Sequence, residues 1–436
     1  MADNSIWDLE EFKPYKAAYE ARRARYAANW RYYKAEYKGV EARFASAPGQ
    51  YARSLIETAV KPLYAPFGRA VNIDVALIPG DWHLTDEAAP LVPAIDQLFE
   101  LSDWETEGDI WVRYGVAMGE GGIRLVDDRE GERLYLQPVS PATYLPIAGA
   151  FRQPTPRMAI FIDMQKDGEG KDVEFAEVIE AERIRTFRNG EPFASGPNRP
   201  AEYPNAQGFV PLFIARHDVG DGQGEPTFDD SIAPLDQVNR QATNMAKMIE
   251  RHAEPQWAAI GADAGDLEKS GDSVWFFPEG SDIKAVLAAV DFPGLLSFIQ
   301  DIKEEMKDGL PELAFAKLVG VERVAAATIE LQMAEAVFKI RRLRKAYDQA
   351  LRQALIHAGK VASEMQLPEL AVLDDPALKF DKDRPVITID ALTRLQIDAA
   401  QQSNELTRQS IERDRMLMAA TAGNEVPTDE GGNNGQ

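Results

Sequence analysis

Hydrophobic residues between positions 231 and 309 recur at steps of three and four, which predicts two helices that each carry one narrow apolar seam. In the first helix the seam consists of Leu235, Val238, Ala242, Met245 and Ile249. In the second, within LLSFIQDIKEEMKDG, it consists of Leu295, Phe298 or Ile299, Ile302 and Met306. Polar and charged residues fill the other faces, so we expect neither helix to be buried on all sides.

Helical spacing also predicts four further helices. One begins near Pro14 and carries six aromatic residues at helical spacing: Tyr15, Tyr19, Tyr26, Trp30, Tyr33 and Tyr37. A second runs from about Gln50 to Leu63, and a third spans residues 86 to 103. A very long helix runs from about Thr328, whose hydroxyl can cap its first turn, to Met365.

Between residues 109 and 216 the pattern favours strands, after the glycines at 115, 119, 121 and 122 break a helix. The strand-like runs are IRLV, RLYLQPVSPATYLPI, RMAIFIDM, DVEFAEVIEAERIRTFRNGEPF and FVPLFIAR. Turns are expected at Asp167-Gly168 and Asn189-Gly190. Short strands follow in PQWAAIG, SVWFF and IKAVLA. The predicted class is α+β, with a largely antiparallel sheet.

Composition narrows the range of functions. The chain has 436 residues, 45% of them hydrophobic, which is enough for two or three domains. The absence of cysteine excludes disulfides, thiolate catalysis and Cys-ligated metal sites. No apolar run is long enough to span a membrane, and MADNSIWDLEEF lacks the order of a signal peptide, so we expect a protein of the cytoplasm or of something assembled there.

The formal charge of −23 argues against a protein that coats nucleic acid by neutralising phosphates. Residues 13 to 43 depart from this balance, with nine Lys or Arg against three Glu. Aromatic rings among these arginines could stack on bases. The interpretation that we favour is a packing face flanked by a solvated basic face.

No motif for catalysis or metal binding is spelled out. The four histidines, His83, His217, His252 and His357, lie far apart without zinc-ligand spacing, and we expect them to be structural or exposed. VGDGQGEP lacks the Lys-Ser/Thr of a phosphate loop, and Asp229-Asp230 are expected to cap the helix that starts at Ser231. We therefore expect no catalytic residues, no metal and no cofactor, although 71 carboxylates leave an acid/base pair open.

After residue 109 several motifs follow one another: YGVAMGEGGIRLV, LQPVSPATYLPI, strands ending in FVPLFIAR, a Gly-rich loop, LDQVNRQATNMAKMIE and EPQWAAIG. This order resembles the portal proteins of tailed bacteriophages, over roughly residues 50 to 410. In that family a ring of identical subunits, usually twelve, sits at one capsid vertex. It surrounds the channel through which DNA is packaged and ejected.

By position, the resemblance implies a portal-like fold. Its parts are an N-terminal helical region at 1–65, an α/β wing of mostly antiparallel strands at 66–230, stem helices at 231–254 and 294–309, and a small β-containing clip at 255–293. A tunnel loop follows at 310–327, then a long wing helix and a helical crown at 328–418. The polar, Gly-rich tail at 419–436 is expected to be disordered.

The family resemblance also implies a non-enzymatic head-to-tail connector in the virion, assembled in the host cytoplasm. Its expected partners are double-stranded DNA in the channel, the terminase large subunit, a head-completion or adaptor protein, and the major capsid and scaffolding proteins. No membrane is expected. The basic stem residues are Arg240, Lys247, Lys303 and Lys307.

The tunnel-loop segment carries unusually many apolar residues for a solvated loop. Gly309 and Pro311 should end the second stem helix. The residues expected to meet neighbouring loops or DNA are Leu313, Phe315, Lys317, Leu318, Glu322 and Arg323. We expect them to form a constriction, and the alternative for this segment is a short buried helix.

Two other functions stay open at this point. One is an acidic α+β metal-dependent hydrolase that uses carboxylates, and the other is a helical scaffold or adaptor without a DNA channel. A closed ring needs two different complementary faces on each subunit, so a large homogeneous assembly would distinguish the portal from both.

Overall fold

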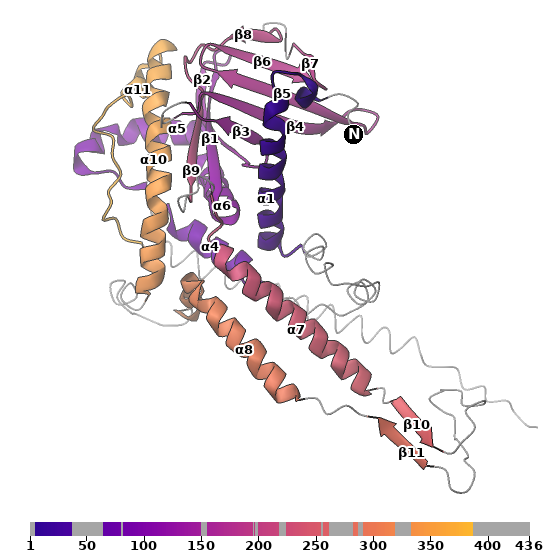
Figure 1. Ribbon diagram of the computed structural model, residues 1–436. Coiled ribbons are helices and arrows are strands. Elements are labelled where there is room, and N and C mark those ends of the chain that lie inside the picture. Colours follow the sequence, from indigo (N-terminus) through magenta and orange to yellow (C-terminus); the bar gives the residue numbers. More distant parts are fainter. Residues whose placement is uncertain are drawn as a thin grey trace, which may run out of the picture.

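The computed structural model describes residues 5–36, 64–79, 82–149, 155–194, 196, 199–217, 224–253, 256–260, 282–286, 291–318 and 333–386. Within these residues a body of helices and sheets carries a long two-helix projection (Figure 1). The predicted helix at 50–63, the strand SVWFF, most of the crown and the tail at 419–436 lie outside the described residues.

Two antiparallel sheets in the body confirm the α+β class. The smaller sheet has the order β2-β1-β9, formed by β2 (Arg133–Val139), β1 (Glu120–Asp128) and β9 (Leu212–Arg216). The larger sheet has six strands: β3 (Tyr144–Ile147), β4 (Met158–Lys166), β5 (Asp172–Glu180), β6 (Arg183–Arg188), β7 (Glu191–Pro192) and β8 (Glu202–Pro204).

Both predicted hairpin turns are confirmed. The pairing of β4 with β5 runs from Met158 opposite Glu180 to Lys166 opposite Asp172, which places Asp167-Gly168 in the turn. At the β6–β7 turn, Asn189 and Gly190 have φ values of +50° and +76°. Positive φ at two successive residues is typical of the tight turns that fit the twist of a hairpin.

Helices cover the smaller sheet and form the main core. They are α4 (Phe67–Leu77), α5 (Val92–Leu101), α6 (Trp104–Met118) and α10 (Ala334–Glu364), followed by the short α11 (Pro368–Ala371). At the centre, the rings of Trp111 from α6 and Tyr347 from α10 meet edge to face at 5.0 Å, and both residues are fully buried. The long helix α10 is thereby fixed against the sheet along its middle.

The expectation that Gly115 breaks a helix is wrong. Gly115 lies inside α6, where a Cβ would collide with the Tyr347 hydroxyl, so the residue serves close packing of α6 on α10. The helix ends instead at Gly119, whose φ of +99° is strained for any residue with a side chain. Close packing overrides the low helix propensity of glycine at position 115.

Two predicted helix boundaries also change. The segment 86–103 divides into a 3₁₀ helix, η5 (Asp86–Leu91), and α5, because Pro90 and Pro93 lack the amide hydrogen that a continuous helix needs. Helix α10 begins at Ala334 with Met333 as its N-terminal flanking residue, later than predicted. Thr328 itself lies outside the described residues.

The N-terminal helix α1 (Lys16–Lys34) follows two 3₁₀ turns, η1 (Ile6–Asp8) and η2 (Lys13–Tyr15), and packs beside the sheets (Figure 1). Its aromatic stripe is a packing face: Tyr19, Tyr26 and Tyr33 are buried. The favoured interpretation of this stripe is confirmed for the described residues, while Tyr37 lies outside them.

Glu120, at the start of β1, is fully buried and ties α1 to both sheets. Its carboxylate pairs with the guanidinium of Arg22, accepts hydrogen bonds from Arg216 Nε at 2.8 Å and from the Tyr144 hydroxyl at 2.7 Å, and lies 3.3 Å from the Tyr26 hydroxyl. Burial alone would raise the pKa of Glu120, but the positive charges of Arg22 and Arg216 outweigh it and lower the pKa.

We predict that Arg22→Met destabilises the protein by at least about 2 kcal/mol, because Glu120 keeps its charge in a buried site with one guanidinium fewer. The matched control is Arg23→Met, since Arg23 is the exposed neighbour on the same helix. Urea unfolding followed by circular dichroism measures both variants. Equal stability of the two would show that Arg22 does not hold α1 in place.

Candidate functional site

The projection from the body consists of α7 (Asp229–Ala253), α8 (Phe292–Asp308) and the hairpin of β10 (Gln256–Ile260) with β11 (Asp282–Val286). We call these elements the stalk (Figure 1). At 1.5 Å per residue the helices are about 37 Å and 25 Å long. Asp229 and Asp230 lie inside the first turn of α7, rather than before it, where they still face the positive end of the helix.

One apolar seam holds the two stalk helices together. Val238 of α7 packs with Ile299 and Ile302 of α8, with Ala242 and Met245 partly buried beside them. Ile299, and not Phe298, is therefore the seam residue at this turn of α8. Farther toward the body, Leu235 and Met306 join the main core cluster.

Polar contacts attach the base of the stalk to the body. The backbone amide of Tyr64 donates a hydrogen bond to Asn239 Oδ1 at 3.3 Å, and Asn239 Nδ2 donates to the Tyr64 carbonyl oxygen at 3.5 Å. The Tyr32 hydroxyl of α1 donates to the Asp236 carboxylate at 2.9 Å. These contacts fix the direction in which α7 leaves the body.

The predicted basic stem residues have different environments. Arg240 is exposed on α7, and the side chain of Lys247 lies outside the described residues. On α8, Lys303 Nζ lies 4.5 Å from the centre of the Tyr64 ring, and Lys307 pairs with Glu304. Lys303 and Lys307 thus both lie near Tyr64.

The segment after α8 is a 3₁₀ helix, η7 (Pro311–Leu318). Phe315 is 4% exposed and packs in the main core, with Leu313 partly buried against the same cluster. Phe315 is thus unavailable to a channel, and the alternative of a short buried helix is correct for this part of the loop. The side chains of Lys317 and Leu318, and residues Glu322 and Arg323, lie outside the described residues.

A buried cluster of charged groups joins η7 to the body. Lys339 of α10 donates to both oxygens of the Glu312 carboxylate at 2.9 Å and to the Thr227 carbonyl oxygen at 3.0 Å. Asp74 of α4 is fully buried nearby, and its oxygens accept no hydrogen bond within the described part of the chain. The Thr227 hydroxyl lies beside Asp74 without hydrogen-bond geometry.

Burial, reinforced by the negative charge of Glu312, raises the pKa of Asp74 to about 8, although Lys339 opposes this shift. Asp74 is therefore mostly protonated at neutral pH. Our sequence reasoning missed this cluster. The sequence feature that could have indicated the cluster is Asp74, a single acidic residue within the apolar run AVNIDVALI.

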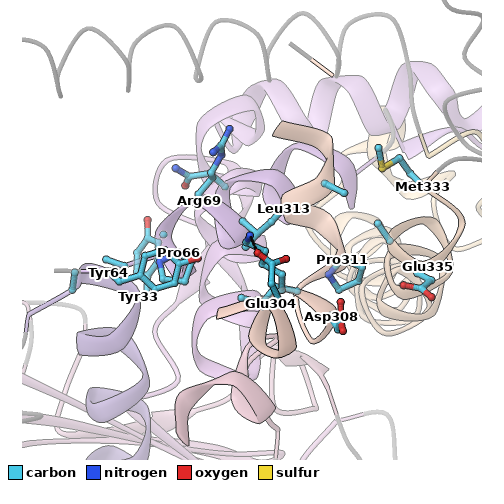
Figure 2. Close-up of a pocket in the computed structure, with 18 of the residues that line it drawn as sticks. Tyr33, Tyr64, Pro66, Arg69, Glu304, Asp308, Pro311, Leu313, Met333 and Glu335 are labelled. Carbon is cyan, nitrogen blue, oxygen red and sulfur yellow. Dashed lines mark hydrogen bonds and ion pairs between the residues drawn. The ribbon is translucent and has the colours of Figure 1, made fainter. Parts of the chain in front are cut away.

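A cavity of about 1160 Å³ lies where the stalk joins the body. Figure 2 shows Tyr33, Tyr64 and Pro66 on one side of it, Glu304 and Asp308 in the middle, and Met333 with Glu335 on the other side. We call it the junction cavity. Its lining mixes apolar groups with charges of both signs, as protein contact surfaces do.

No described residues form a cluster of three or more histidine or acidic side chains able to hold a metal ion. His217 is partly buried with Nε2 3.0 Å from the Tyr347 hydroxyl oxygen, and removal of its ring from water lowers its pKa to about 4. His357 packs between the rings of Phe209 and Phe213. Both have structural surroundings. Among the described helices, none has the length and apolar character to cross a membrane.

No protein-family model and no curated protein matches the chain. Solved structures with a similar fold include three of particles and particle necks. One is described as the virion of a native gene transfer agent (GTA) particle, with 15% identity and a TM-score of 0.39 over 88% of this chain and 92% of that chain. A second is the neck of a native GTA particle computed with C12 symmetry, with 14% identity and a TM-score of 0.35 over 84% of this chain and 87% of that chain. A third is the neck of an empty GTA particle computed with C6 symmetry, with 15% identity and a TM-score of 0.37 over 89% of this chain and 95% of that chain. TM-scores this low carry no functional inference.

We predict that Asp74→Asn removes a pH dependence of stability. The pKa of Asp74 in the folded protein, about 8, lies above the ordinary value of 3.8. The stability that its protonated form contributes is therefore complete below about pH 4 and is lost as pH rises through 8. Relative to the variant, the free energy of unfolding of the wild type should fall between about pH 5 and pH 8, by up to about 1.4 kcal/mol per pH unit.

The measurement is urea unfolding at matched protein concentration across this pH range. Asp96→Asn, at an exposed position on α5, controls for the loss of a carboxylate. The same pH profile in wild type and Asp74→Asn would contradict the prediction.

Proposed function

We propose that the chain is the subunit of a portal ring at one vertex of a phage-like capsid. The ring is a non-enzymatic channel for double-stranded DNA during packaging and ejection. Its stalks form the stem, and the β10–β11 hairpins form the clip that docks the terminase large subunit and a head-completion or adaptor protein. The body forms the wing, which contacts the major capsid and scaffolding proteins.

The observation that carries this proposal is the exposed apolar surface on both sides of the stalk seam. Leu296 is 47% exposed and Phe298 is 43% exposed. They are two positions apart, which turns their side chains about 200° from one another around α8. They flank the buried Ile299 on opposite sides, so the stalk presents two different apolar faces.

Two different faces on one element suit a closed ring. In such a ring each subunit contacts one neighbour with one face and the other neighbour with the second face. An isolated two-helix projection gains little from exposed Leu and Phe, whereas each would be covered between adjacent stalks. Twelve subunits is the number that the family resemblance implies.

The charge of the chain suits a channel in which DNA slides. A subunit with a formal charge of −23 repels phosphates on balance, so DNA that passes through the ring would be held weakly and could slide. Arg240 and Lys247 of α7 remain the proposed basic stem residues. The proposed constriction consists of the partly buried Leu313 with Lys317, Leu318, Glu322 and Arg323, without the buried Phe315.

The test of the function is the size and shape of the purified assembly. We expect rings far heavier than the 48.4 kDa subunit, with a central hole visible by negative-stain microscopy and a mass measured by light scattering. A stable monomer at micromolar concentration in moderate salt would contradict the proposal. ATPase or nuclease turnover that copurifies with the ring would contradict its non-enzymatic part.

We predict that Leu296→Ser combined with Phe298→Ser weakens ring assembly and leaves the subunit folded, because these side chains are solvent-exposed within one subunit. Loss of two apolar contacts per interface should raise the concentration for half-assembly about tenfold or more. Met164→Ser is the control, since Met164 is also 43% exposed but lies on β4 of the large sheet. Unchanged assembly of the double variant would show that these stalk residues do not form part of the ring interface.

A further inference from the structure

We propose that the basic C-terminal end of α1, at Arg31 and Lys34, docks onto an acidic stripe of α8, at Glu305 and Asp308, on the next copy of the chain. This contact rests on the proposed ring and names a second part of its interface. The partner is therefore another copy of this protein.

The basic face of α1 lies beside its packing face, and Lys34 Nζ lies 5.0 Å from the centre of the Tyr33 ring. Four exposed cations follow this surface: Lys16, Arg23, Arg31 and Lys34. No carboxylate of the described residues forms an ion pair with them, whereas Arg22 on the packing face pairs with the buried Glu120. The face thus concentrates positive charge on a chain that is acidic overall.

The acidic stripe of α8 lies away from the seam. Asp301, Glu305 and Asp308 are exposed and are spaced at steps of four and three, so they follow one side of the helix. Phe298 continues the same side toward the tip of the stalk. Like charges at this spacing repel one another within a helix, and a basic partner surface would relieve that repulsion.

Both surfaces lie at the same level of the subunit. Lys34 at the end of α1 and Asp308 at the end of α8 line the same junction cavity. In Figure 1, α1 runs down the body with its C-terminal end toward the stalk. Rotation about a ring axis parallel to the stalk keeps every residue at its own height, so surfaces on neighbouring copies can meet only at matching levels.

Matching stoichiometry favours another copy over DNA as the partner. Each subunit carries one basic end of α1 and one acidic end of α8, so every interface of a closed ring can pair them once. DNA phosphates would match the cations of α1 but would leave the acidic stripe without a partner. Complementary charge also favours one register between neighbours over others.

The test is a charge swap in the full-length chain. Arg31→Glu with Lys34→Glu reverses the basic surface, and Glu305→Lys with Asp308→Lys reverses the acidic one. At low salt each double variant should need about tenfold or more protein for half-assembly, because like charges then face each other. The quadruple variant should assemble as readily as the wild type, and 0.5 M salt should weaken all these differences.

Lys16→Glu with Arg23→Glu is the matched control, because it makes the same charge change on the same face at the other end of α1. We expect it to assemble as the wild type does. All substituted residues are exposed within the subunit. Because Lys34 Nζ also lies over the rings of Trp30 and Tyr33, thermal unfolding of each variant is measured beside assembly to separate lost stability from a lost contact.

The remaining outcomes distinguish a failure of this contact from a failure of the proposed ring. If the wild type forms no ring, the proposed function fails and the contact with it. If rings form and the double variants assemble normally, or if the quadruple variant is not restored, the contact is wrong while the ring stands. If the Arg31/Lys34 variant assembles normally but its rings lose binding to a duplex DNA probe, these cations meet DNA instead.

Discussion

The ion pair between Lys339 and the fully buried Glu312 ties η7, and with it the end of α8, to the core of the body. Glu312 follows α8 directly, and Lys339 lies on the helix that spans the core. A carboxylate removed from water costs several kcal/mol unless it is paired, and Lys339 supplies that pairing where η7 packs on the body. Burial, reinforced by the negative charge of Glu312, holds the pKa of Asp74 well above its ordinary value, although Lys339 opposes the shift.

The cluster around Glu120 has the opposite balance, with two guanidinium groups on one carboxylate. Its pKa is lowered where that of Asp74 is raised, although both groups are fully buried. The difference follows from the number of cations within reach, because burial acts on both in the same direction. Glu120 therefore attaches α1 to the sheets through a fully buried ion pair with Arg22.

Features set by local periodicity and turn chemistry were predictable from the sequence. The seam at Val238 and Ile302 and the turn at Asn189-Gly190 follow from spacing and from residue type. Gly115 and Phe315 could not be placed in this way, because their roles depend on Tyr347 and on the core beneath η7. Contacts between residues distant in the chain leave no trace in a local pattern. For the same reason, the charged cluster at Asp74 could not be predicted before the fold was known.

The direction of the exposed stalk residues bears on the kind of assembly that the subunit can form. A two-fold dimer needs one self-complementary patch, while a ring needs two patches that face two neighbours. In a large ring the directions to these neighbours are nearly opposite, and in a small ring they meet at a sharp angle. Leu296 and Phe298 point to nearly opposite sides of α8, and the acidic stripe continues the Phe298 side. This geometry favours many subunits around a wide opening in the proposed ring.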